Sequence, residues 1–445
     1  MTRNPLSIVG AWVVTLSAFI FLLVFLIDLF GLHHNPYVGL IFFLIVPLLF
    51  VLGLLLIPLG MVLEHKRRER GLQPRRLPRI DLNDPRHRRA IAAVLALTFV
   101  NVLIVSLAAY RGVEYMDSTQ FCGQVCHTVM EPEFTAHRDG PHSRVPCVEC
   151  HIGAGAPWFV KSKIDGTRQV VAVMRSSYSR PIATPVYDLR PARDTCEQCH
   201  WPDKFHGDKV AVIPSFGNDE KNTSSPTRLV LHIGGGLPQL GQPAGIHWHT
   251  NPQNEIEYVA TDDRRQEIPY VRLKTADGAV HEFRTAEGTD AKLANRERRR
   301  MDCVDCHNRP THEFLATPER AVDAALARGA MPAALPFARR QAVEALKANY
   351  ADRPTAEREI AQRLRSFYAA NDPPGQDAEV DRLVKTAQFL YSRNVFPAMK
   401  VTWGTHLSNV GHTDAPGCFR CHDDQHKSAD GRVIRQDCDL CHDIQ

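Results

Sequence analysis

Three long apolar blocks dominate the first quarter of the 445-residue chain. They span residues 7–30, 37–63 and 90–110, and each has about the 20 residues that a helix needs to cross a bilayer. The first block does not resemble a cleaved signal peptide, because its apolar core is too long, its only basic flank is Arg3 and no small-residue cleavage site follows it. We therefore expect three transmembrane helices, the first of them uncleaved.

The distribution of basic residues predicts the orientation of these helices. Residues 64–89 contain ten Lys or Arg and four acidic residues, whereas the link 31–36 between the first two blocks has no Lys or Arg. By the positive-inside rule the basic loop and the N-terminus are cytoplasmic, and the third helix leads into the periplasm. A nucleic-acid-binding patch is the alternative for the basic run, but its position beside membrane helices accounts for it. Asp28 is the only charged residue in the three blocks, so an ion pathway is unsupported.

After residue 200 the spacing of apolar positions becomes typical of short strands. Four such runs predict a small β insertion between residues 201 and 301. The runs are residues 229–235, 255–261, 268–274 and 279–285. Asp277 and Gly278 predict the tight turn of a hairpin between the last two runs.

Further along, apolar positions recur with a helical period, and Pro and Gly residues separate the segments. The predicted helices span residues 318–328, 336–350, 355–371 and 378–394. In the third helix Ile360, Leu364, Phe367 and Tyr368 share one face, which we interpret as core packing.

All twelve cysteines occur in six motifs in which a histidine directly follows the second cysteine. Five motifs read C-x-x-C-H, and the first, CGQVCH, has one extra residue between its thiols. The motifs are Cys122/Cys126-His127, Cys147/Cys150-His151, Cys196/Cys199-His200, Cys303/Cys306-His307, Cys418/Cys421-His422 and Cys438/Cys441-His442. The thiols of such a motif form thioethers to the vinyl groups of a haem, and the histidine binds the iron. We therefore expect six covalently bound haem c groups, which together form a path for electrons.

Other uses of paired cysteines fit this pattern less well. Zinc knuckles, iron–sulfur sites and redox dithiols use C-x-x-C pairs, but none of them requires a histidine after every pair. The wider first motif leaves open whether its haem is attached through both thiols or through one. Because cysteine attachment of haem takes place outside the cytoplasm in bacteria, the motifs also place the chain after about residue 120 in the periplasm.

Together these patterns predict a mainly α, membrane-anchored multihaem cytochrome c, with three transmembrane helices and a periplasmic haem-packed domain that contains a small β insertion. The expected organisation is a membrane anchor at 1–110, haems 1–3 at 111–200, the β insertion at 201–301, haem 4 at 302–317, a helical segment at 318–396 and haems 5–6 at 397–445.

The net charge differs between the two sides of the membrane. Residues 1–110 carry 11 Lys or Arg and 5 acidic residues, a balance of +6, whereas the remainder carries 42 and 44, a balance of −2. Haem propionates add further negative charge to the periplasmic part. We expect either a partner with a basic docking face or the burial of many propionates.

A second ligand on each iron decides whether a haem only carries electrons or also binds a substrate. The distal candidates are Met130, His142, His232, His247, His249, His312, His412 and His426. His247 and His249 point to the same side if residues 246–250 are extended, and we expect one of them to bind an iron. His312 and His426 follow a motif closely, so each is expected to serve a neighbouring haem; core packing is the alternative for Met130. The remaining histidines, His137, His206, His281 and His406, are expected at the surface.

Several segments resemble the NapC/NirT family of membrane-anchored multihaem quinol dehydrogenases. They are the third apolar block, the run CGQVCHTVM, the run SRVPCVECH with the preceding His142, and CEQCH, over about residues 89–200, with residues 303–307 as a fourth haem motif. The resemblance implies that the first haem, marked by His127 and Met130, lies beside the membrane and takes electrons from a quinol. It also implies that Lys161, Lys163 and Asp165 help to form the quinol pocket.

The chain is larger than the core of that family, which has one membrane helix and four haems. It has two more apolar blocks, a wider first motif, an insertion of about 100 residues and two more C-terminal motifs, and so is similar to three-span members that feed periplasmic or extracellular acceptors. We expect an inner-membrane hexahaem cytochrome of anaerobic respiration that oxidises quinol and passes electrons to a periplasmic acceptor protein, alone or within a larger respiratory complex. The alternative is a terminal reductase of a small nitrogen or sulfur oxyanion. That function needs an open iron, and the surplus of histidines and the lack of a C-x-x-C-K motif favour the first hypothesis.

Overall fold

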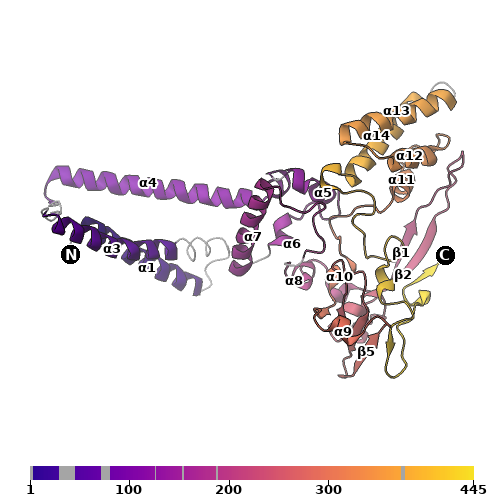
Figure 1. The fold of residues 1–445 in the computed structure, drawn as a ribbon, viewed down its shortest axis with the longest axis horizontal. Helices are drawn as coiled ribbons and strands as arrows, with labels where there is room; N and C mark the ends of the chain where they lie inside the picture. The colour runs from indigo at the N-terminus through magenta and orange to yellow at the C-terminus, as the bar shows by residue number, and fades with distance from the viewer. Residues whose placement is uncertain are drawn as a thin grey trace. The chain divides into compact units, whose positions relative to one another are not determined.

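The protein is described here from a computed structural model of residues 1–445. The described residues are 4–29, 46–71, 81–125, 127–152, 155–186, 189–371 and 376–445. They form two compact units, one of residues 1–116 and 152–168 and the other of residues 117–151 and 169–445 (Figure 1). The chain is mostly helical with some sheet.

The first unit is built from long helices: α1 (Pro5–Leu29), α3 (Val46–Glu69), α4 (Pro85–Met116) and the first part of α7 (Ala156–Met174). α1 and α3 are antiparallel and approach closely at Gly10 and Gly53, where an added Cβ would lie 2.8 Å from the nearest atom across the contact. The Ser7 hydroxyl donates a hydrogen bond of 2.8 Å to the carbonyl of Ile57. Small residues and an interhelical hydrogen bond of this kind are typical of helix pairs in membranes.

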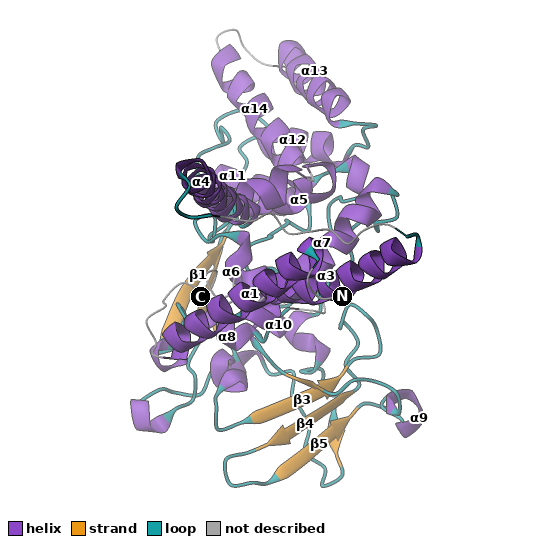
Figure 2. Ribbon diagram, turned by 90° about the vertical axis from the view of Figure 1, so that its left-hand side faces the viewer, coloured by secondary structure: helices purple, strands orange, loops and turns teal. Residues whose placement is uncertain are grey.

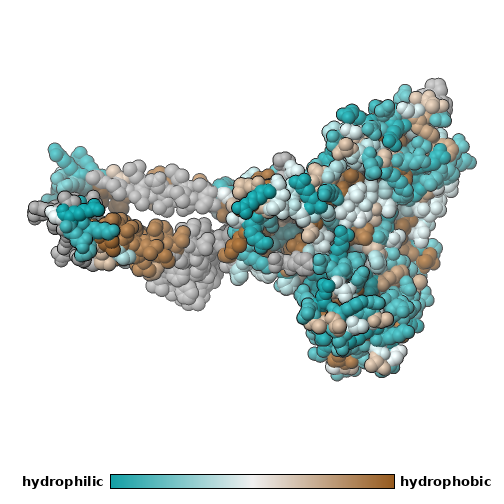
Figure 3. All heavy atoms as spheres, viewed as in Figure 1, coloured by the Kyte–Doolittle hydropathy of each residue, from teal (hydrophilic) through white to brown (hydrophobic). Residues whose placement is uncertain are grey.

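Apolar side chains gather on the outside of α1 and α3 (Figure 3). Among the described residues, one helical stretch, Leu48–Arg67, is long and apolar enough to cross a membrane, and a shorter apolar stretch is Pro5–Ile20. The predicted first and third spans coincide with α1 and α4, although Phe30 lies outside the described residues, as does the part of the second span at 37–45.

The second unit begins with short helices, several of which carry the cysteine motifs. The π-helical turn η2 (Phe121–Val125) is followed by α5 (His127–Arg138), α6 (Cys147–His151), the end of α7, α8 (Ala192–Cys196), η3 (Pro202–Lys204), η4 (Pro238–Leu240), η5 (Ile246–Thr250), α9 (Asp290–Leu293) and α10 (Cys303–Cys306). Near the C-terminus lie the 3-10 helices η6 (Pro397–Met399), η7 (Gly417–Arg420) and η8 (Cys438–Leu440).

Two antiparallel sheets contain all four predicted strand runs. The five-stranded sheet has the order β6-β3-β4-β5-β7, and the three-stranded sheet has the order β1-β2-β8. Figure 2 shows β3, β4 and β5 side by side. The strands are β1 (Asp208–Ile213), β2 (Thr227–His232), β3 (Glu255–Val259), β4 (Tyr270–Lys274), β5 (Val280–Arg284), β6 (Arg299–Arg300), β7 (Lys427–Ser428) and β8 (His442–Ile444). The predicted hairpin is confirmed, because β4 pairs with β5 and Gly278 takes the positive φ of 84° that its turn requires. Both sheets also include C-terminal strands, so residues 201–301 share them with the end of the chain.

The four predicted helices after residue 317 are confirmed as α11 (Pro318–Ala327), α12 (Ala338–Lys347), α13 (Arg353–Asn371) and α14 (Asp377–Asn394). They share one apolar core. Ile360, Leu364 and Tyr368 of α13 are buried in it and Phe367 packs against it, which confirms that this face is used for packing.

Candidate haem sites

The longer first motif begins in a turn of unusual geometry. Cys122 lies in the π-helical turn η2, whereas Cys147 and Cys303 begin ordinary α-helical turns. A π turn contains about one residue more than an α turn, which is the number by which this motif exceeds the others. Cys126, the second thiol of this motif, lies outside the described residues.

Consecutive motifs are neighbours in space, as the influence of each thiol on the next one shows. A hydrogen bond with Cys122 lowers the pKa of the Cys147 thiol to about 6. A hydrogen bond with Cys303 likewise lowers the pKa of Cys196, and burial together with the nearby Cys196 raises the pKa of Cys150.

The series continues through the C-terminal motifs. Burial raises the pKa of Cys306 to about 11, with a further contribution from Cys418, and burial together with Cys418 also raises the pKa of Cys441. All six motifs are therefore arranged in space in the same order as in the sequence.

Two of the predicted attachment cysteines, Cys199 and Cys438, differ from the others in exposure. Both are exposed, whereas the other described cysteines are partly buried. For Cys199 the cause is local, because α8 ends at Cys196 and the chain turns there, with the Cys199 N–H donating to the Cys196 carbonyl at 3.1 Å. The turn leaves the second thiol of the third motif open to solvent, and haem attachment at Cys199 stays a prediction from the motif.

The histidine of every motif from the second to the sixth faces another histidine. The pairs and the distances between their ring centroids are His151–His312 at 6.2 Å, His142–His200 at 6.1 Å, His247–His307 at 6.4 Å, His249–His422 at 5.8 Å and His412–His442 at 6.1 Å. An imidazole nitrogen binds a first-row metal at about 2.0 Å, and the ring centroid lies about 1.1 Å further away, so two rings on opposite sides of one iron have centroids about 6.2 Å apart. The spacing of the five pairs fits a six-coordinate haem iron between them.

Hydrogen bonds orient the non-motif ring in four of these pairs. The Nδ1 atoms of His142, His247, His249 and His312 donate to backbone carbonyls at 3.0, 2.7, 2.8 and 3.0 Å. A histidine that ligates a metal is commonly held in this way, because the bond fixes the tautomer and leaves Nε2 free for the metal. His412 is instead stacked on Phe419, with ring centroids 4.2 Å apart.

Burial favours the neutral form of two of the paired imidazoles. It lowers the pKa of His312 to about 4 and also lowers the pKa of His249. Iron binds the neutral form of imidazole, so this desolvation favours ligation over protonation.

The expected geometry of His247 and His249 was wrong. Residues Ile246–Thr250 form the 3-10 helix η5 and are not extended. The tighter winding directs the two side chains to different motif histidines, His307 and His422. One short helix thereby contributes a ring to each of two neighbouring sites.

Two other predicted ligands already have protein partners. Both ring nitrogens of the fully buried His426 are hydrogen-bonded, Nδ1 to Asp423 at 2.9 Å and Nε2 to the Ile268 carbonyl at 2.7 Å. The ring of His232 lies between two carboxylates, with Nδ1 3.0 Å from Asp208 and Nε2 3.5 Å from Asp443. Neither ring presents a free nitrogen to a motif histidine in this structure.

The histidines expected at the surface divide into two groups. His206 is exposed and His281 half-buried, but His137 and His406 are buried, against expectation. The ring of His137 lies 6.4 Å from that of His312, but its Nε2 is bonded to the Val145 carbonyl at 2.9 Å. Burial lowers the pKa of His406 to about 3, with a further contribution from Arg309.

The predicted residues of the quinol pocket lie on two helices. Met130 is half-buried on α5, which begins at His127. Lys161, Lys163 and Asp165 lie on α7. Lys161 and Asp165 are four residues apart and share a face of α7, whereas Lys163 points to the other side.

Asp305, inside the fourth motif, was missed by the sequence analysis and anchors that motif. Its Oδ1 accepts hydrogen bonds from the Tyr258 hydroxyl at 2.7 Å and from Arg299 Nε at 2.8 Å. Its backbone carbonyl accepts a bond of 2.6 Å from Arg420 of the fifth motif. Asp302 caps the N-terminus of α10, and Asp305 completes a capping box with it. Two acidic residues three positions apart are a signal of such a box that is visible in the sequence.

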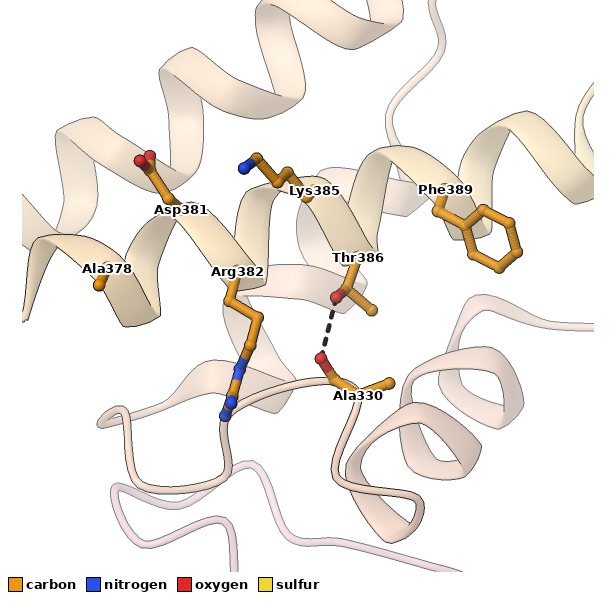
Figure 4. Close-up of a pocket in the computed structure, with 7 residues that line it drawn as sticks. All are labelled: Ala330, Ala378, Asp381, Arg382, Lys385, Thr386 and Phe389. Carbon is orange, nitrogen blue, oxygen red and sulfur yellow. Dashed lines mark hydrogen bonds between the residues drawn. The ribbon is translucent and has the colours of Figure 1, made fainter.

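A hollow of about 350 Å³ lies on α14 (Figure 4). Its lining includes Arg382, Lys385 and Phe389, and Thr386 donates a hydrogen bond of 3.0 Å to the Ala330 carbonyl at its edge. No cysteine or histidine lines it, so it provides none of the ligands that a haem needs.

Comparison with known proteins identifies the family of the chain. Residues 84–182 match the N-terminal region of the NapC/NirT cytochrome c family. The chain is 42% identical over 448 residues to the cytochrome c-type protein ImcH of Geobacter sulfurreducens, an alignment that covers 99% of this chain and 88% of ImcH. No solved structure matches the chain. The protein therefore belongs to the NapC/NirT family of multihaem c-type cytochromes, membrane-anchored electron-transfer proteins that carry covalently bound haem c and exchange electrons with redox partners in respiration.

Proposed function

We propose that the protein is a hexahaem quinol dehydrogenase of the bacterial inner membrane, which oxidises quinol and relays electrons to a periplasmic acceptor. The observation that carries this proposal is the set of five facing histidine pairs beside motifs that follow one another in space. Two imidazoles on one iron leave no position for a substrate, so these sites suit electron transfer. For the same reason the pairs weigh against a terminal reductase.

The chain would hold each haem through the cysteine thiols of its motif and through side chains that bind the iron. Five of the irons would be held by the facing histidines His151 with His312, His200 with His142, His307 with His247, His422 with His249 and His442 with His412. Held in this way, the haems would supply one-electron redox chemistry. The protein sets the distances and the polarity around each site, and residues 397–445 contribute the last two motifs.

The proposed quinol site belongs to the first motif. Oxidation of one quinol releases two electrons and two protons, and the electrons leave singly. His127 and Met130 would be the ligands there. On α7, Lys161 and Asp165 would accept and release protons, and the exposed side chains of Val160 and Ile164 would contact lipid or the quinol tail.

The proposed membrane topology has three spans within residues 1–110. The N-terminus and the basic segment 64–89 would lie in the cytoplasm, and the haem-binding part in the periplasm. This orientation puts the first motif directly after α4 leaves the membrane.

Exchange of His127 tests the proposal. We expect the His127→Met protein, solubilised in detergent with its haems attached, to lose reduction by menaquinol, while dithionite still reduces the distant haems. The matched variant His412→Met changes the far end of the path and is expected to keep menaquinol oxidation. Unimpaired menaquinol oxidation in His127→Met would refute the assignment of the quinol site.

A further inference from the structure

One face of the three-stranded sheet is exposed beside the last motif. In the register of its strands, Asp208 of β1 lies opposite His232 of β2. Val210 of β1 and Asp443 of β8 lie on either side of the same residue of β2, Val230. Because alternate residues of a strand point to the same face, this face carries Asp208, Val210 and Val212 of β1 together with Asp443 of β8.

The apolar part of this face has no cover among the described residues. Val210 and Val212 are 50% and 61% exposed, and β1 is an edge strand of its sheet. His442 alternates with Asp443 and therefore points to the opposite face, towards His412. The haem predicted between these two histidines lies on that side, so it does not cover the valines. Exposed apolar residues on an edge strand are characteristic of surfaces that bind a partner.

Carboxylates surround the two valines. Asp208 and Asp443 contact the ring of His232 at 3.0 and 3.5 Å. Asp439 lies inside the last motif, in the 3-10 helix η8 that directly precedes β8, next to the exposed Cys438. The loop that attaches the last haem therefore borders the same surface.

The charge of this region selects the kind of partner. On this surface Asp208, Asp439 and Asp443 contribute three carboxylates before any propionate is added. Arg228, opposite Val212, is a basic residue on the exposed face. The remaining field is negative, so it attracts a basic protein and repels an acidic one.

We propose that the acceptor docking surface, made of Asp208, Val210, Val212, Asp439 and Asp443, binds a soluble redox protein with a basic face around an apolar contact. This inference rests on the proposed function, since it takes the last motif as the point where electrons leave the chain. The carboxylates would accelerate encounter and orient the partner, and the valines would form the desolvated centre of the contact.

The test neutralises the carboxylates in the full-length holoprotein. In detergent, the triple variant Asp208→Asn, Asp439→Asn, Asp443→Asn is reduced with menaquinol and mixed in a stopped-flow instrument with oxidised mitochondrial cytochrome c, a small protein with a lysine-rich face. We expect the second-order rate at low salt to fall on the order of tenfold and its dependence on salt to flatten. A second variant, Val212→Lys, keeps the carboxylates and is also expected to slow the reaction.

A matched control removes the same charge elsewhere. Glu357→Gln, Glu359→Gln and Asp377→Asn on α13 and α14 are expected to leave the rate unchanged. A triple variant at the docking surface that is reduced normally by menaquinol and reacts as fast as the unaltered protein would overturn the docking surface alone. If the unaltered protein is a dimer and the triple variant is a monomer that reacts at an unchanged rate, the surface is a contact between two copies and the docking proposal is overturned. Failure of menaquinol to reduce the unaltered protein would instead overturn the proposed function.

Discussion

The hydrogen bond between Tyr258 and Asp305 lends itself to a quantitative test. Tyr258 is 1% exposed, and its hydroxyl donates to Asp305 Oδ1 at 2.7 Å. A hydrogen bond to a charged group contributes about 1.5–3 kcal/mol to stability. In Tyr258→Phe the carboxylate keeps Arg299 Nε at 2.8 Å and the backbone N–H of Asp302 at 2.7 Å. We therefore expect a loss of about 2 kcal/mol, in the lower part of that range.

Thermal unfolding of the detergent-solubilised holoprotein, followed by circular dichroism, measures this loss. For a unit of this size 1 kcal/mol corresponds to roughly 2 °C, so Tyr258→Phe is expected to lower the midpoint by roughly 4 °C. The control is Tyr391→Phe, because Tyr391 is 3% exposed and its hydroxyl has no hydrogen bond among the described residues. Equal midpoints for the two variants would refute the role assigned to Asp305.

Three further predictions concern other parts of the chain. Gly53→Leu places side-chain atoms where even a Cβ lies 2.8 Å from Val14, so cysteine cross-linking between α1 and α3 is expected to become less efficient. Arg299→Gln removes a positive charge that compensates the buried carboxylate of Asp305, and we expect the free energy of unfolding to fall by about 3 kcal/mol, measured as a lower urea midpoint. Hydrogen bonds from Thr355 lower the pKa of Asp352, so the ionised carboxylate stabilises the start of α13 at neutral pH. We expect this stabilisation to be lost as the pH falls below the usual carboxyl range, and faster amide exchange at Thr355 would report the loss.

Local patterns predicted most of the elements, because each strand or helix in question has its own periodicity. The hairpin of β4 and β5 and the helices α11–α14 follow from such patterns. β1 was missed because it opens with Asp208 and Lys209, which hide the alternation that follows. β7 and β8 are too short to show a pattern and exist through pairing with strands more than 140 residues away in sequence.

The histidine pairs show where sequence reasoning stops. Position along the chain identified His142 and His312 as good candidates but did not give their partners, because pairing depends on contacts between distant segments. His426 met the same criteria as His312, yet both of its nitrogens are taken by Asp423 and the Ile268 carbonyl. The two rings of η5 became assignable only once its winding was known.

The most direct test of the account is the spin state of the irons in His249→Ala, compared with His426→Ala, by electron paramagnetic resonance of the oxidised protein. Because His249 faces His422 across 5.8 Å, its removal is expected to open one iron and to produce one high-spin signal per protein. His426→Ala is expected to keep the low-spin spectrum of the unaltered protein. A fully low-spin spectrum in His249→Ala, or a new high-spin signal in His426→Ala, would contradict the proposed pairing of ligands.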